Sequence, residues 1–149
     1  MKIVVPLDLS EVATKAIEPA ADIARGIGDE LLLVTVSGHR IRTDLRELAD
    51  AENTGVPELI DQYLTSTAAE LSDVDVDYRV IPGDTAAGTL VDFTDAADDI
   101  RMIVMATHGR TGVERWRLGN VTEKVVRHAT VPVMVIPTRT KVSAELSGG

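Results

Sequence analysis

The sequence predicts an α/β domain built on a parallel sheet, and two observations carry that prediction. Five short apolar runs rich in Val and Ile recur along the 149 residues, and most are continuous rather than alternating. Such runs are typical of strands that are buried on both faces of a sheet. Segments with helical periodicity separate the runs, and this alternation produces layered domains with right-handed crossovers. The expected strands are residues 2–7, 30–36, 76–81, 101–106 and 131–136.

The first expected helix follows the first strand. Apolar residues recur at steps of three and four from Ala13 to Ile27, which indicates one buried face. Ser10 is a suitable N-cap, and Gly28 or its neighbour Gly26 would end the helix. Pro19 removes one backbone hydrogen bond, so we expect a kink there.

Three further helices are expected between the later strands. The second begins at Pro57, because proline is favoured in a first helical turn. The third spans about residues 84–97. The long polar stretch 37–55 precedes the second helix and is expected to contain a short helix around residues 44–51.

The fourth helix is expected to start near Asn120. Asn120 and Glu123 have the spacing of a capping box, with Asn in the place of Ser or Thr. The apolar residues expected to face the core are Val121, Val125 and Ala129.

The composition excludes several kinds of partner and chemistry. A net charge of −9 disfavours nucleic acid and anionic membrane surfaces, and the chain has no Cys for thiolate catalysis or cysteine zinc sites. We find no signal peptide and no apolar run long enough to span a membrane, so we expect a cytoplasmic protein. The 11 Arg against 4 Lys, with abundant Asp, leave two sources open: a halophile, or an ordinary organism with an acidic protein.

The loop after the fourth strand is the best candidate for ligand binding. In open parallel sheets, ligands bind at the carboxyl ends of the strands. This loop contains Gly109, Gly112 and Gly119 and leads into the N-terminus of the last helix. Glycines and free helix amides together can hold a phosphate. The loop is neither a Walker A motif nor the dinucleotide fingerprint, which belongs after the first strand.

Three segments of the chain resemble universal stress proteins: VVPLDLSEVATKAI, RMIVMATHGRTGVERWRLGNVTEKVVRHA and VPVMVIP. The resemblance covers residues 1–137 as one domain and leaves residues 138–149 as a flexible tail. The nucleotide-binding branch of that family has a G-x2-G-x9-G-[S/T] motif. Its positions match Ala106, Gly109, Gly119 and Asn120, so the spacing is intact, while Ala replaces the first Gly and Asn replaces Ser or Thr.

The resemblance implies a Rossmann-like sheet of the adenine nucleotide alpha hydrolase type, with strand order 3-2-1-4-5 and helices on both faces. It also implies ATP at the carboxyl edge, with any Mg²⁺ arriving on the phosphates. Adenine and ribose would lie against Pro6, Leu7, Asp8 and Val36. The ribose and phosphates would lie against the later loop, at Ala106, Thr107, His108, Gly109, Arg110, Gly119, Asn120 and Val121.

The resemblance further implies a homodimer paired through the last strand. The residues at that interface would be Val131, Val133, Val135 and Ile136. In the implied strand order the last strand is an edge, and an apolar edge is normally covered.

Catalytic chemistry is missing from the sequence. His108 lies in the candidate loop without a serine nucleophile, and no His, Asp and Glu residues have metal-ligand spacing. We therefore expect an ATP-binding stress protein that signals without efficient turnover. Two alternatives stay open: a dimeric interaction module that binds no nucleotide, and a slow ATPase.

Overall fold

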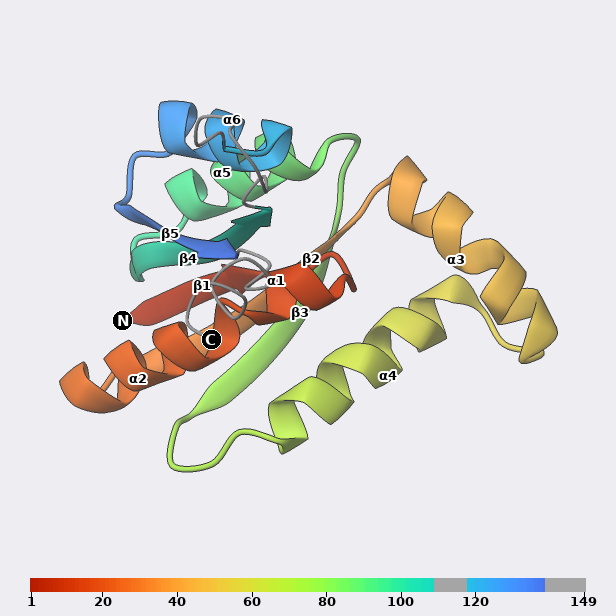
Figure 1. Cartoon of the computed structure of the whole chain (residues 1–149), viewed down its shortest axis with the longest axis horizontal. Helices are drawn as coiled ribbons and strands as arrows, with labels where there is room; N and C mark the ends of the chain where they lie inside the picture. The colour runs from red at the N-terminus through yellow and green to blue at the C-terminus, as the bar shows by residue number, and fades with distance from the viewer. Residues whose placement is uncertain (109–117, 139–149) are drawn as a thin grey trace, which may run out of the picture.

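Five parallel strands form one open sheet in the computed structural model, which describes residues 1–108 and 118–138 (Figure 1). The order β3-β2-β1-β4-β5 confirms the order that the resemblance implies. β4 and β5 each end two residues later than expected. The strands are β1 (Lys2–Pro6), β2 (Glu30–Ser37), β3 (Val76–Pro82), β4 (Ile100–His108) and β5 (Val133–Thr138).

Helices cover both faces of this sheet and bury two separate apolar clusters. One face is covered by α1 (Glu11–Thr14), α2 (Ile17–Ile27) and α4 (Val56–Ala69), and the other by α5 (Ala86–Ala96) and α6 (Asn120–His128) (Figure 1). The continuous apolar strands supply side chains to both clusters. In β2, for example, Leu31 and Leu33 enter the first cluster, whereas Leu32 and Val34 enter the second.

The first helical segment is divided earlier than we predicted. Ser10 caps α1 as expected, with its Oγ accepting from the amide of Ala13, but α1 ends at Thr14. The chain restarts as α2 at Ile17, so Pro19 lies in a first turn, where its missing N–H removes no helical hydrogen bond. In place of the kink expected within one helix, the chain is interrupted at Lys15 and Ala16. Gly28 ends α2 in the left-handed conformation, as predicted.

The helix expected within residues 37–55 is longer than predicted. α3 spans His39–Ala51 and extends away from the sheet (Figure 1). Its few apolar residues have a helical spacing: Ile41 and Leu45 pack against the first cluster and Ala49 is buried. The following helix, α4, begins at Val56 and has Pro57 in its first turn, as predicted.

The start of α6 corrects two predictions. Gly119 is the N-cap and Asn120 the first helical residue, so Asn120 and Glu123 form no capping box, and Glu123 pairs with Arg127 instead. Val121 is 42% exposed, because the inward stripe of α6 runs through Thr122 and Val125. Ala129 packs partly against the second cluster, as expected.

The last strand, β5, also differs slightly from expectation. β5 starts at Val133, so Val131 lies in the turn before the strand and packs against the second cluster. Of the predicted tail, only Thr138 is described, and it ends β5. β5 is an edge strand, as the resemblance implies.

The amino edge of the sheet is held by an ion pair that connects β2 to β4. The side chain of Asp29, which is 4% exposed, lies just before β2 and accepts hydrogen bonds from the guanidinium of Arg101 on β4. The hydrogen bond from Arg101 is the main reason why the pKa of Asp29 lies below its ordinary value.

We expect Asp29 to contribute to acid sensitivity. A carboxyl group whose pKa is lowered by folding stabilises the protein above its unfolded pKa, and this contribution disappears as the pH falls through the folded pKa. Asp29→Asn should therefore lower the free energy of unfolding at pH 7 and flatten its decline between roughly pH 5 and 2 in urea titrations. Asp99→Asn, which removes a half-exposed partner of Lys2, is the control and should cost much less at pH 7. Equal losses in both variants would contradict this prediction.

Candidate functional site at the carboxyl edge of the sheet

The turn after β1 is fixed to β2 by backbone and side-chain hydrogen bonds. The amide of Leu7 donates to the carbonyl of Val34 (2.8 Å), and the carbonyl of Leu7 accepts from the buried hydroxyl of Thr35 (2.9 Å). Because β1 lies between β2 and β4, this turn sits where the strand order reverses. That switch point is where open parallel sheets bind ligands.

The next residues of this turn form a strained corner. Leu9 has φ of +70°, a left-handed conformation that is unfavourable for a leucine. The exposed Asp8 stabilises the corner, since its Oδ1 accepts from the amide of Ser10 (3.0 Å) and from the Ser10 hydroxyl. The chain thus holds the Asp8 carboxylate at the surface of the switch point.

The second part of the site is the junction of β4 and α6. Thr107 is 4% exposed, and its Oγ1 accepts from the amide of Gly119 (3.0 Å). The carbonyl of Thr107 accepts from the hydroxyl of Thr138 at the end of β5 (2.8 Å). Two hydrogen bonds to one residue therefore join the ends of β4, β5 and α6.

The first turn of α6 presents amides that the helix itself leaves unbonded. The bond from the amide of Glu123 to the carbonyl of Gly119 (2.8 Å) is the first of the helix. No side chain of the described residues caps this end, and Asn120 and Val121 are both exposed. These amides and the partial positive charge of the helix N-terminus favour an anion.

The structure gathers most of the predicted nucleotide-binding residues along one edge. They occupy the ends of β1, β2 and β4 and the start of α6, and they are Pro6, Leu7, Asp8, Val36, Ala106, Thr107, His108, Gly119, Asn120 and Val121. Gly109 and Arg110 lie outside the described residues. The side chains of Leu7, Val36 and Thr107 are buried, so these three positions offer a ligand chiefly their backbone. The amide of Gly119 is bonded to Thr107, which leaves the amides of Asn120, Val121 and Thr122 as the unbonded donors at this helix end.

Tyr63 on α4 was missed by the sequence reasoning. Its side chain packs against the first cluster, and its buried hydroxyl forms no hydrogen bond with the described residues. Burial raises the pKa of Tyr63, and the negative charge of Asp8 raises it further. The signal was available, because Tyr63 lies three residues after the buried Ile60 and therefore on the same helix face.

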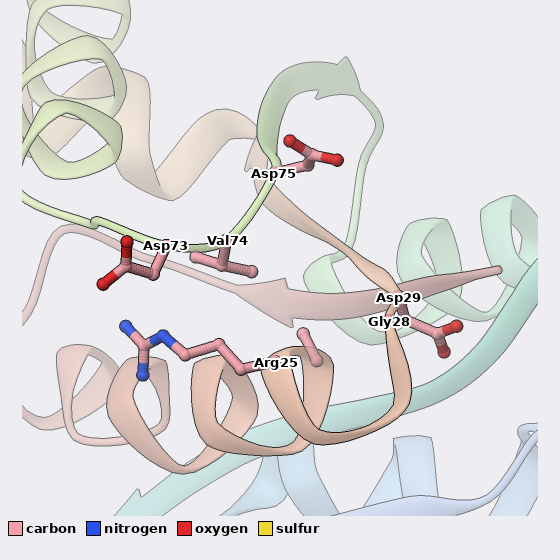
Figure 2. A pocket seen from close by; sticks show the side chains of 7 residues that line it. Arg25, Gly28, Asp29, Asp73, Val74 and Asp75 are labelled. Carbon is pink, nitrogen blue, oxygen red and sulfur yellow. The ribbon is translucent and has the colours of Figure 1, made fainter.

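An open hollow of about 370 Å³ lies at the opposite, amino edge of the sheet (Figure 2). Its lining includes Arg25 and three carboxylates, on Asp29, Asp73 and Asp75. Arg25 already donates to the carbonyl of Ser72 (3.1 Å) and pairs with Asp22 (3.0 Å). The hollow is therefore poorly suited to an anionic ligand. A second open hollow, beside the turn between α3 and α4, is also remote from the switch point.

Within residues 1–108 and 118–138, no group of three or more His, Cys, Asp and Glu side chains has the arrangement of a metal site. No helix in those ranges combines the length and the apolar character needed to cross a membrane.

The fold and the site together define an open, doubly wound α/β domain whose candidate site lies at the switch point of its sheet. The model of the universal stress protein family matches residues 1–137, and the chain belongs to that family. A universal stress protein of Methanocaldococcus jannaschii is 31% identical over 147 residues, with 91% of this chain and 81% of that protein covered.

Two solved structures share the fold and contain a nucleotide. A universal stress protein in complex with cAMP is 22% identical, covers 93% of this chain and 98% of its own, and has a TM-score of 0.62. A universal stress protein from Archaeoglobus fulgidus in complex with dAMP is 24% identical, covers 91% and 97%, and has a TM-score of 0.61. At these identities the likeness establishes the fold.

Proposed function

We propose that this protein is a cytoplasmic universal stress protein that binds ATP at the β1–β4 switch point and signals through the bound nucleotide without efficient turnover. The observation that carries the proposal is the uncapped N-terminus of α6 at this edge of the sheet. Family membership and the adenine nucleotides in two structures of the same fold support it.

In this proposal the amides of Asn120 and Val121 donate to the phosphates, because they are the first two of the three first-turn amides that α6 leaves unbonded. The adenine and ribose lie toward Pro6, Leu7, Asp8 and Val36, where the Asp8 carboxylate accepts from an amine or a hydroxyl group. Any Mg²⁺ comes with the phosphates. The net charge of −9 does not oppose this arrangement, since backbone amides carry no formal charge.

The departures from the family motif are compatible with binding. Ala106 lies inside β4, two residues before its end, where φ is ordinarily negative, so its methyl group needs no glycine conformation. Asn120 keeps its backbone amide and replaces a hydroxyl with a longer amide side chain. We therefore expect weaker binding than with the unmodified motif.

Calorimetry tests this proposal. Purified protein titrated with ATP should bind with one site per chain, and nucleotide released by denaturation should be identified by mass spectrometry. Cyclic AMP, dAMP, AMP and GTP serve as competitors that define the base and phosphate preference. If no nucleotide is released and no heat is measured at millimolar ATP, the dimeric interaction module becomes the better alternative. Phosphate release above that of the Asn120→Pro variant would favour the slow ATPase.

The same proposal includes a homodimer through β5. The amide of Ile103 donates to the carbonyl of Pro132 (2.9 Å), and Ile103 lies opposite Val133. In a parallel ladder the backbone N–H and C=O groups of successive residues point to opposite sides of the strand. Those of Met134 therefore point toward β4, and those of Val133 and Val135 point toward the open edge. The side chain of Met134 is 37% exposed, so the edge offers both free main-chain groups and apolar surface to a second copy.

A further inference from the structure

Among the described residues of the site, Thr107 on β4, like Thr35 on β2, has a buried polar side chain that bonds to a different element. Its hydroxyl accepts from the amide of Gly119, twelve positions later in the chain (3.0 Å). A β-carbon added to Gly119 would lie 3.3 Å from the same hydroxyl oxygen, so the two residues are in close contact. The N-cap residue of α6 is therefore hydrogen-bonded directly to a residue near the end of β4.

The bond between Thr107 and Gly119 also affects the amides of the residues that follow Gly119. Asn120 and Val121 follow Gly119 immediately, so the direction of their amides depends on where Gly119 is held. No side chain of the described residues caps α6 at this point. The Thr107 hydroxyl bonds the amide of the N-cap residue itself, so the amides of the first turn stay unbonded.

Thr107 is in turn supported from β5. Its carbonyl accepts from the hydroxyl of Thr138, the last described residue (2.8 Å). Thr138 lies opposite His108 in the pairing of β4 and β5. The end of the edge strand is thus tied to the residue that holds the start of α6.

We propose that Thr107 is a positioning residue, whose hydroxyl sets the α6 amides at the distance and angle that a nucleotide phosphate requires. This inference rests on the proposed function, because it assigns the residue that arranges the same site. Thr107 acts through Gly119, since its own side chain is buried beneath the loop end rather than open to a ligand.

The test compares Thr107→Val with Thr107→Ser in ATP calorimetry. Valine keeps the shape and removes the acceptor, so the Gly119 amide loses its partner, and we expect ATP affinity to fall about tenfold. Serine restores the oxygen and should bind ATP within about threefold of the natural protein. Hydrogen exchange of the Gly119 amide should accelerate in the valine variant and stay slow in the serine variant.

Thr94→Val is the matched control for losing a buried threonine hydroxyl. Thr94 is 1% exposed and donates to the carbonyl of Val91 within α5, far from the site. This variant should lower the melting temperature and leave ATP affinity unchanged. If Thr107→Val fails to fold, Thr138→Val loosens the same junction from the exposed end of β5 and should weaken ATP binding about threefold.

The outcomes separate this inference from the proposed function. A natural protein that binds ATP, together with a Thr107→Val variant that binds equally well, would overturn the positioning role alone. A natural protein that binds no adenine nucleotide would overturn the proposed function, and the positioning role with it, whatever the exchange of Gly119 shows. The positioning role is supported if Thr107→Val binds ATP more weakly and Thr107→Ser binds it nearly as well as the natural protein.

Discussion

Asn120→Pro should weaken ATP binding by roughly 10- to 100-fold while leaving α6 folded. Asn120 is the first residue of the helix, and proline is favoured there because its fixed φ suits a first turn. Gly119 has φ −66° and ψ 163°, the extended conformation that a residue before proline prefers. The substitution therefore removes one amide donor to phosphate without a helical hydrogen bond being lost. Calorimetry with ATP gives the affinity, and circular dichroism with thermal unfolding reports the helix.

Two variants at the same position separate the amide from the side chain. Asn120→Ala keeps the backbone donor, so its ATP affinity should stay within about threefold of the natural protein. Asn120→Ser restores the hydroxyl of the family motif and should bind somewhat more tightly. Equal affinity in the proline and alanine variants would show that the α6 amides do not contact the phosphates.

The layered fold was predictable because its signals are local and repeated. The Val- and Ile-rich runs correspond to the five strands, of which β1, β2 and β4 are buried on both faces, whereas the edge strands β3 and β5 are only partly buried. Residue type alone predicted the N-cap at Ser10 and gave Gly28 as one of two glycines that would end the helix. The strand order came from the family resemblance rather than from periodicity. The strand pattern predicted which segments leave the carboxyl edge, since parallel strands end together, and the resemblance supplied the individual site residues.

The contacts and backbone conformations that arrange the site could not be predicted from local sequence patterns. The bond between Thr107 and Gly119 joins positions separated by a loop, and no local pattern encodes it. The capping box at Asn120 fitted the spacing rule, but Gly119 took the N-cap position because its extended backbone meets Thr107 there. The positive φ of Leu9 could not be predicted from its residue type, because leucine rarely adopts this conformation.

Val135→Pro should convert the proposed β5-paired homodimer to a monomer without unfolding the chain. The amide of Val135 is directed to the open edge by the ladder alternation, so proline there removes a donor that the sheet itself does not use. In a twofold interface each substitution acts twice, and the ring also blocks close approach of the second strand. We expect the dimer dissociation constant to rise at least about tenfold, measured by sedimentation velocity over a range of concentrations.

Met134→Pro is the matched control, one residue away in the same strand. The main chain of Met134 is directed toward β4, so proline at this position removes a bond inside the sheet and should destabilise the fold itself. The two prolines therefore predict opposite results: a folded monomer at 135 and a less stable chain at 134. A Val135→Pro variant that remains dimeric would exclude main-chain pairing through β5, and reversed behaviour of the two variants would show that the register of β5 against β4 differs from that described.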